Sequence, residues 1–412
     1  MPNPEPMRSV LDNGLVVLTR ERPGARAVAV LIMYRAGAFF DPERLSGLAH
    51  LTEHMMFRGT PSFPHGRIDA LTGRLGGTNN AMTTGDHALY YFVLPAGHWR
   101  LALEIEADRM LNCPPGERSF EVEKSVAAEE RMMLDDDPEA LIYEAVDALA
   151  FGGHPYGRPV AGSLEDIRRI TSDDVHKFYR RHYSPANAVL AVVGDLTHED
   201  VSGAARELFG SAPGGRRAEF LAEAPVPDGP RVAGLRCGRC QPRVLLAFPC
   251  PSASHPDSPA MELLAAHLAS GRGSVLHAEL VRGRGVASDV TASRLMQTEP
   301  GLFYLGADLH DDVGPGDCEE LLLAILGRLR EDGLTQEELV RARNLTRVDT
   351  LLSQESCLGS AGALAFWESL GSWELEERYD RGLDETDCEA VRRVAERYLS
   401  PDLRSTAWLV PD

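Results

Sequence analysis

The sequence carries one pattern twice, as ITSDDVHKFYRRHYSPANAVLAVVGD at residues 170–195 and as ETDCEAVRRVAERYLSPDLRSTAWLVPD at residues 385–412. Each copy starts as a capped helix and continues through a Tyr and a Ser-Pro step into an apolar strand. Because proline cannot continue a helix, Ser184-Pro185 and Ser400-Pro401 place the change from helix to strand at the same point of both copies. A repeat of this length predicts two copies of one domain rather than a solenoid.

A segment rich in Gly, Pro and Ala, residues 210–230, lies almost at the midpoint of the 412 residues. It predicts a linker at 213–230 between domains 1–212 and 231–412. Periodicity in the first domain predicts three strands (15–19, 27–34 and 87–94) and three amphipathic helices (101–110, 120–134 and 140–150). The expected fold class is therefore α+β, with each copy a sheet layered with helices.

The composition excludes several classes of protein. Hydrophobic residues make up 43% and charged residues 25%, which is typical of a folded globular chain. Asp and Glu outnumber Lys and Arg by 62 to 42, so neither nucleic acid nor an anionic membrane is an expected partner. No apolar run reaches the roughly 18 residues of a membrane span, and residues 1–6 resemble neither a signal nor a transit peptide.

The cysteines point to a reducing compartment. Their number, seven, is odd and they are widely spread, which favours free thiols in the cytoplasm over a disulfide framework. Cys237 and Cys240 form a single CxxC without the second pair that a zinc knuckle needs. We expect these two residues to be small side chains beside a strand.

The clearest chemical motif is GLAHLTEHMMFRGT at residues 47–60. On a helix, His50 and His54 lie four residues apart on one face, so both imidazoles can bind one metal ion. Glu53 lies near the same face and can reach a water that the metal activates. Catalytic zinc takes three His or carboxylate ligands and leaves room for water, and H-x-x-E-H is the inverted form of the common zinc-protease motif.

The third ligand is expected on the predicted helix that contains residues 120–134. Glu123 and Glu130 are seven residues apart and share a face, so one can bind the metal while the other holds an imidazole N–H. Spacing alone does not choose between them, and it does not exclude Glu129.

Taken together, these motifs resemble the M16 peptidases, which include pitrilysin, insulysin and the mitochondrial processing peptidase, and especially their small bacterial two-domain members. The resemblance covers nearly all of the first half and, more weakly, the second. It implies two homologous domains, each a mostly antiparallel sheet layered with helices, in the LuxS/metallohydrolase-like M16 fold. The segments that carry it are 11–15, 47–60, 80–83, 123–138, 154–157 and 183–189.

The resemblance also implies a role for each residue of the motif. His50, His54 and Glu130 would bind one zinc ion per chain, and Glu123 would support the site from behind. Glu53 would be the general base that takes a proton from the attacking water and later gives it to the leaving amine.

Substrate-binding residues follow from the same resemblance. Asn80 and Ala81 match the strand along which family members lay an extended peptide by β-augmentation. The second domain of active members contributes an Arg and a Tyr. Arg282 is our candidate for the Arg, although a surface charge is an equal reading, whereas Ser288 or Asp289 stands where the Tyr is expected.

The second domain is expected to lack a zinc site. The segment that aligns with the motif, residues 265–271, contains His267 and no Glu. Half-molecules of this family close against another half to form a chamber, so a second M16-type chain is the expected partner. The missing Tyr favours a heterodimer, with this chain as its catalytic, β-like subunit, over a homodimer.

The predicted function is therefore zinc-dependent endopeptidase activity (EC 3.4.24) on peptides or small unfolded proteins in the cytoplasm. The alternative is a non-catalytic scaffold subunit, which would normally carry a degraded zinc motif. A third possibility is an enzyme devoted to one precursor peptide, which the sequence does not separate from general peptide turnover.

Overall fold

Both copies of the repeat fold in the predicted way in the computed structural model. Helix α7 (Ser172–His182) leads through the short turn Pro185–Asn187 into strand β6 (Ala188–Gly194), and α14 (Cys388–Tyr398) leads through Pro401–Leu403 into β11 (Ser405–Pro411). Each Ser-Pro step thus ends a helix and starts a strand. The structure describes residues 4–113, 116–222, 224–225 and 227–412.

The chain forms two compact units that do not follow the halves of the sequence. Unit 1 comprises Met1–Met132, Pro159–Phe220 and Leu351–Glu374, and unit 2 comprises Met133–Arg158, Leu221–Thr350 and Leu375–Asp412. The predicted domains, 1–212 and 231–412, were defined by the repeat in the sequence and not by compact units in space. Their boundaries stay a prediction. The described residues between 212 and 230 form no helix or strand, and Glu223 and Val226 of the predicted linker lie outside the described residues.

Unit 1 is built on a six-stranded sheet in the order β1-β2-β6-β3-β5-β4, in which only β2 and β6 pair in parallel. Its other strands are β1 (Met7–Val10), β2 (Val16–Glu21), β3 (Ala27–Tyr34), β4 (Thr78–Thr83) and β5 (Ala88–Pro95). Its other helices are α1 (Leu48–Met56), α2 (Arg67–Arg74), α3 (Trp99–Asn112), α4 (Glu117–Asp135, largely in this unit), α6 (Leu164–Arg169), α8 (His198–Phe209) and α12 (Cys357–Leu370).

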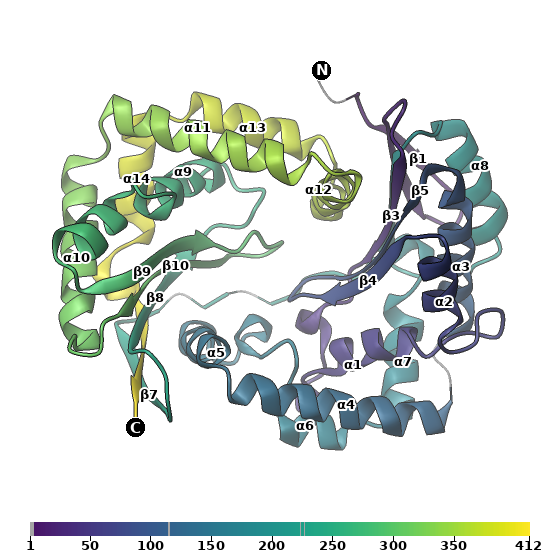
Figure 1. The fold of residues 1–412 in the computed structure, drawn as a ribbon, viewed down its shortest axis with the longest axis horizontal. Helices are drawn as coiled ribbons and strands as arrows, with labels where there is room; N and C mark the ends of the chain where they lie inside the picture. Colours follow the sequence, from purple (N-terminus) through teal and green to yellow (C-terminus); the bar gives the residue numbers. More distant parts are fainter. Residues whose placement is uncertain (1–3, 114–115, 223, 226) are drawn as a thin grey trace. The chain divides into compact units, whose positions relative to one another are not determined.

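Both faces of this sheet are buried. Alternate residues of β3 belong to two separate apolar clusters, one with α3 and α8 and the other with α12. Figure 1 shows α3 and α8 on one side of the sheet and α12 on the other. A strand that is buried on both faces reads as a continuous apolar run, which explains why residues 27–34 are almost entirely hydrophobic.

Helix α12 comes from the C-terminal half of the sequence and is held on this sheet by apolar and polar contacts. Leu364 is fully buried against the sheet. Two arginines of the sheet bind the helix: Arg8 donates to Glu368 at 2.9 Å, and Arg20 donates to Ser360 at 2.7 Å. The helix is therefore an integral layer of unit 1.

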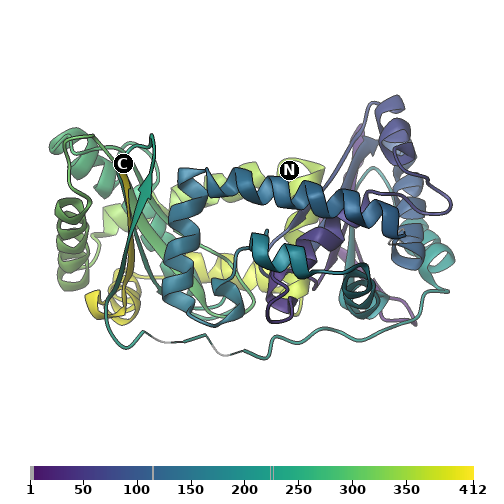
Figure 2. The same cartoon turned by 90° about the horizontal axis from the view of Figure 1, so that it is seen from below.

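Unit 2 is built on a five-stranded sheet in the order β7-β11-β8-β10-β9, in which only β7 and β11 pair in parallel. Figure 2 shows β11, in yellow, beside the teal β7. Its other strands are β7 (Arg231–Cys237), β8 (Arg243–Cys250), β9 (Ala287–Arg294) and β10 (Gly301–Leu309). Its other helices are α5 (Pro138–Phe151), α9 (Ser258–Ala269), α10 (Pro315–Asp332), α11 (Gln336–Ser353, largely in this unit) and α13 (Leu375–Glu385).

Helix α5 is the counterpart of α12, because it comes from the N-terminal half and packs on the sheet of unit 2. The Tyr304 hydroxyl of β10 donates to Asp147 of α5 at 2.7 Å, and Arg231 of β7 donates to the carbonyl of Leu149. Each sheet is thus covered on one face by a helix from the other half of the sequence.

These observations confirm the predicted fold class, with two mostly antiparallel sheets layered with helices. The six elements predicted in the first domain are also confirmed, with ends that differ by a few residues. Every helix in the described part of the chain is too short or too polar to span a bilayer.

Candidate metal centre

The start of α1 is fixed by hydrogen bonds from backbone amides to the Asp41 carboxylate. Gly47, just before the helix, adopts a φ of +93°, which glycine accepts without strain. The Asp41 carboxylate accepts hydrogen bonds from the N–H groups of Gly47 and Ala49 at 2.7 and 2.8 Å. An anion at a helix N-terminus is favourable. The helix therefore starts at a defined residue and presents His50 and His54 on one face.

Three donor atoms of unit 1 converge at this helix. The Nε2 atoms of His50 and His54 lie 3.3 Å apart, and Glu130 Oε2 of α4 lies 3.8 Å from the first and 3.3 Å from the second. Among the described residues, this is the only group of three His, Cys, Asp or Glu side chains whose donor atoms meet in this way.

The donor set fits zinc in both chemistry and spacing. Zinc binds His nitrogen and carboxylate oxygen at about 2.0–2.2 Å in tetrahedral sites, so its ligand atoms lie roughly 3.3–3.5 Å from one another. The three separations observed here are close to that range. Two imidazoles and one carboxylate also leave a fourth position for water or substrate.

Glu123 lies behind the histidines and links two side chains. Its Oε2 accepts a hydrogen bond from His54 Nδ1 at 3.0 Å, and its Oε1 accepts from Arg58. With its proton on Nδ1, His54 presents a bare Nε2 to the donor cluster. Glu129 is exposed. The structure therefore brings Glu130 to the histidine Nε2 atoms and Glu123 to the opposite side of His54.

The electrostatic environment shifts the pKa values of the two histidines in opposite directions. Burial and, to a smaller extent, the neighbouring His54 lower the pKa of His50 to about 4, while Glu130 opposes the change. Burial also acts to lower the pKa of His54, but the bond to Glu123 and the nearby carboxylates raise it overall. Burial acts to raise the pKa of Glu123, and the bonds from His54 and Arg58 lower it overall. A neutral His50 and an ionised Glu123 are the forms that a metal site uses.

Glu53 is held beside the cluster by the strand that faces it. The Thr83 hydroxyl, at the end of β4, donates to Glu53 Oε2 at 2.7 Å. Burial raises the pKa of Glu53, while the bond from Thr83 opposes the rise. A carboxylate whose pKa is raised towards neutrality is suited to accept and return a proton.

Asn80 and Ala81 lie on β4, which is the edge strand of the sheet and pairs on one side only, with β5. Within the described part of the chain, the other edge of β4 offers its backbone groups to an added strand. Asn80 is exposed, and its side-chain oxygen accepts a hydrogen bond from the Ala81 N–H at 2.9 Å. The strand and Glu53 are joined through Thr83.

Arg282 lies in unit 2, on the π-helical turn His277–Gly283, and is exposed. The metal cluster belongs to unit 1, so the role of Arg282 in substrate binding stays a prediction. Ser288 and Asp289 start β9, so the position expected for a Tyr carries none.

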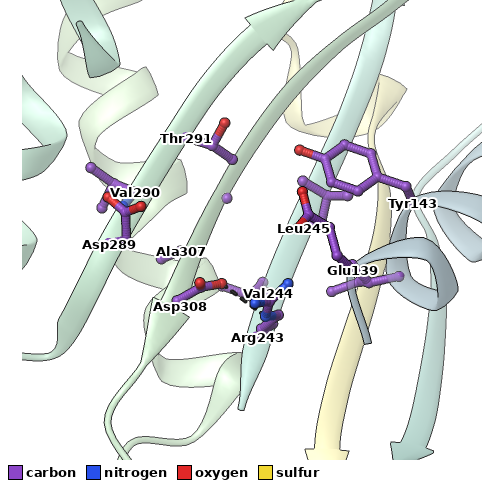
Figure 3. Close-up of a pocket in the computed structure, with 12 residues that line it drawn as sticks. Glu139, Tyr143, Arg243, Val244, Leu245, Asp289, Val290, Thr291, Ala307 and Asp308 are labelled. Carbon is purple, nitrogen blue, oxygen red and sulfur yellow. Dashed lines mark hydrogen bonds and ion pairs between the residues drawn. The ribbon is translucent and has the colours of Figure 1, made fainter. Parts of the chain in front are cut away.

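Sequence reasoning missed Tyr143 of α5, whose hydroxyl interacts with Thr291 of β9 (Figure 3). No spacing signal links these two residues, because they belong to different halves of the sequence.

Arg58 and Thr83 also escaped the sequence analysis as individual residues. Arg58 lies one helical turn after His54, so the spacing of the motif contained a signal for it. Thr83 is distant in the sequence from Glu53, and only the packing of β4 beside α1 brings the two together.

Comparison with known proteins finds relatives over nearly the whole chain. A family model described as "Insulinase (Peptidase family M16)" matches residues 16–164, and one described as "Peptidase M16 inactive domain" matches residues 169–346. An uncharacterized zinc protease of Mycobacterium tuberculosis is 30% identical over 400 residues, which cover 96% of this chain and 91% of that protein.

Two further relatives bear on assembly and on fold. A probable mitochondrial-processing peptidase subunit beta of Arabidopsis thaliana is 25% identical and covers 96% of this chain and 76% of that protein. The crystal structure of a protease from Helicobacter pylori matches with a TM-score of 0.93 and 26% identity, over 99% of this chain and 100% of that one.

Proposed function

The chain belongs to the M16 peptidase family, and from that premise we propose that it is a zinc-dependent endopeptidase. Its proposed substrates are extended peptides, small unfolded proteins and precursor peptides. The relative from Mycobacterium tuberculosis is named a zinc protease, which supports the class of activity. The observation that carries the proposal is the convergence of His50, His54 and Glu130 beside the half-buried Glu53.

In the proposed mechanism, His50, His54 and Glu130 hold the zinc ion. When bound, zinc supplies Lewis-acid polarisation of the scissile carbonyl and makes water a stronger acid. Glu53, oriented by Thr83, takes the proton of the attacking water and returns it to the leaving amine. The free edge of β4 at Asn80 and Ala81 aligns the peptide by backbone hydrogen bonds, which tolerate varied side chains.

The alternative is a non-catalytic scaffold. The second half matches a model described as an inactive domain, which on its own says nothing against activity of the first half. The complete donor set in unit 1 favours catalysis, because a scaffold has no use for a half-buried carboxylate of raised pKa beside three side chains that can bind a metal.

We further propose that the enzyme works with a second M16-type chain, as a heterodimer or a homodimer, in the cytoplasm. One relative is named a subunit, which supports the first point. All seven cysteines are free thiols, which supports the second, because secreted proteins tend to pair theirs.

The test is peptide hydrolysis by the purified chain after zinc removal and zinc restoration, alone and with a candidate partner chain. We expect a chelator to abolish cleavage of an unstructured peptide and added zinc to restore it. Cleavage that is fully retained in the metal-free chain would contradict the proposal. A chain that binds zinc but never cleaves, with any partner, would favour the scaffold.

A further inference from the structure

Cys237 and Cys240 lie at a turn of unit 2 that takes no part in the proposed peptidase mechanism. Cys237 is the last residue of β7, and residues 237–240 form the turn that leads from this strand towards β8. Strand β7 is at the edge of its sheet, and Cys237 is directly opposite Pro411 of β11. Figure 1 shows β7 next to the C-terminal end of the chain. The two cysteines are therefore at the periphery of unit 2.

The turn brings the two thiols next to each other. A β-turn places the Cα atoms of its first and fourth residues within about 7 Å, and the Cα atoms of a disulfide usually lie about 4.4–6.8 Å apart. The Cys240 thiol donates to the carbonyl oxygen of Cys237, with its Sγ 3.3 Å from that oxygen. A hydrogen bond also links the two cysteine side chains. The Cys240 sulfur is thus folded back over the turn, within reach of the Cys237 sulfur.

The other five cysteines are separate from one another. Cys113, Cys250 and Cys318 are buried. Cys357 and Cys388 are partly exposed, and their thiols donate to oxygens of other residue types, in Ala27 and Gln336. Within the described part of the chain, which contains all seven cysteines, two thiols contact each other only at Cys237 and Cys240.

A disulfide suits this turn better than a metal ion does. Structural zinc takes four ligands, whereas the described residues offer no third His, Cys, Asp or Glu donor close enough to these two thiols. Gly238 and Arg239, between the cysteines, are exposed, so a small reagent can approach the turn. Disulfides of cytoplasmic proteins are usually transient and redox-sensing, which is the kind expected at such an accessible site.

We propose that Cys237 and Cys240 form a reversible disulfide by exchange with a low-molecular-weight disulfide such as oxidised glutathione. The proposal is independent of the proposed peptidase function. First, one protein thiolate attacks a sulfur of the small disulfide, which gives a mixed disulfide and releases one small thiolate. The second protein thiol loses its proton to water and attacks the protein sulfur of the mixed disulfide, which releases the other small thiolate. The chain loses two electrons and two protons, and the small disulfide is reduced to two thiols.

The order of attack follows from the environment of Cys240. Burial and the hydrogen bond with Cys237 raise the pKa of Cys240 to about 11, although Arg243 opposes the rise. The thiolate is the form that attacks a disulfide, so Cys240 is a poor first nucleophile at neutral pH. Cys237 therefore attacks first, and Cys240 closes the internal disulfide.

The test is treatment of the purified full-length chain with oxidised glutathione, followed by alkylation of the remaining thiols, digestion and mass spectrometry. In the wild type we expect a disulfide between Cys237 and Cys240, which excess reduced glutathione reopens. In Cys240→Ser the reaction should stop at the mixed disulfide of Cys237 with glutathione. In Cys237→Ser, Cys240 should react at least tenfold more slowly than Cys237 does in Cys240→Ser.

The matched control is Cys388→Ser, which removes another partly exposed thiol of unit 2 and should form the internal disulfide like the wild type. A wild-type chain in which both thiols stay open to alkylation would overturn the proposal. The same holds for a chain that stops at a mixed disulfide, or for an internal disulfide that excess reduced glutathione does not reopen. Loss or retention of peptidase activity does not affect this result, because only the state of the two thiols is measured.

Discussion

Glu130 and Glu129 are neighbours on α4 that differ in what they face. Glu130 Oε2 lies 3.3 Å from His54 Nε2, whereas Glu129 is exposed. Adjacent helix positions are about 100° apart, so one of the two turns away from the histidines. We predict that Glu130→Gln weakens zinc binding by more than 100-fold, beyond the roughly 10–100-fold expected for Glu123→Gln. Competition with a chromophoric chelator measures the affinity.

The matched control for this prediction is Glu129→Gln, which removes the same charge from the same helix and should bind zinc like the wild type. Equal zinc affinity in Glu130→Gln and the wild type would remove Glu130 from the site.

Thr83 orients Glu53 through one hydrogen bond of 2.7 Å. A hydrogen bond to a charged group contributes about 1.5–3 kcal/mol, and 1.4 kcal/mol corresponds to a tenfold change in rate. We predict that Thr83→Val lowers kcat about tenfold or more while KM and zinc content stay the same. Thr83→Ser keeps the hydroxyl and should restore most of kcat. A Thr83→Val enzyme with unchanged kcat, or a Ser variant as slow as the Val variant, would show that this bond does not orient the base.

At the scale of elements, α5 is coupled to the sheet of unit 2 through a titrating group. Burial raises the pKa of Asp147 to about 7, against the opposing effect of the Tyr304 hydroxyl. The unfolded chain loses this proton near pH 3.9. Between these values the folded chain binds more protons than the unfolded chain, so stability from this group falls as the pH rises from 4 to 8.

We predict that Asp147→Asn removes this loss. Between pH 4 and 8, the wild type should lose roughly 2 kcal/mol of unfolding free energy relative to the variant. This is about half of what three pKa units would give, because the side chain is partly exposed and screened. Urea unfolding at each pH measures the difference. A difference between the two proteins that does not change with pH would contradict the assigned pKa.

The helices and strands themselves were largely predictable from the sequence. In each unit, however, one helix comes from the other half of the sequence, and this was not predictable. Strands such as residues 27–34 have a local signature, and Ser-Pro fixes two helix ends. Periodicity shows that 140–150 is an amphipathic helix without showing which sheet it covers. Helices α5 and α12 each pack on the sheet built by the other half of the sequence, and such long-range packing leaves no local signal.

The candidate site was likewise predictable only in part. His50, Glu53 and His54 lie within about one helical turn, so the motif alone predicts that their side chains converge. Glu130 lies on another helix, and the residues alone did not distinguish it from Glu123 and Glu129 as the third metal ligand. The tertiary packing of α4 against α1 now separates the three by distance and exposure.

At the scale of the whole molecule, we predict that the isolated chain cleaves an unstructured peptide weakly or not at all with zinc present. The second domain has no Tyr at the start of β9, so a partner chain should complete the site. A related chain with a broken zinc motif and an intact Arg/Tyr pair should restore activity. Full activity of the isolated chain, unchanged by any such chain, would contradict this prediction.

The central claim, that this chain is a zinc peptidase with Glu53 as its base, is tested most directly by zinc content and peptide turnover in Glu53→Gln. The assay contains zinc and any partner chain that activity requires. Exposed Glu43→Gln serves as the control. We predict one zinc ion per chain in both variants, with turnover at least 100-fold lower in Glu53→Gln and normal in Glu43→Gln. Near-normal turnover in Glu53→Gln, with zinc retained, would contradict the account.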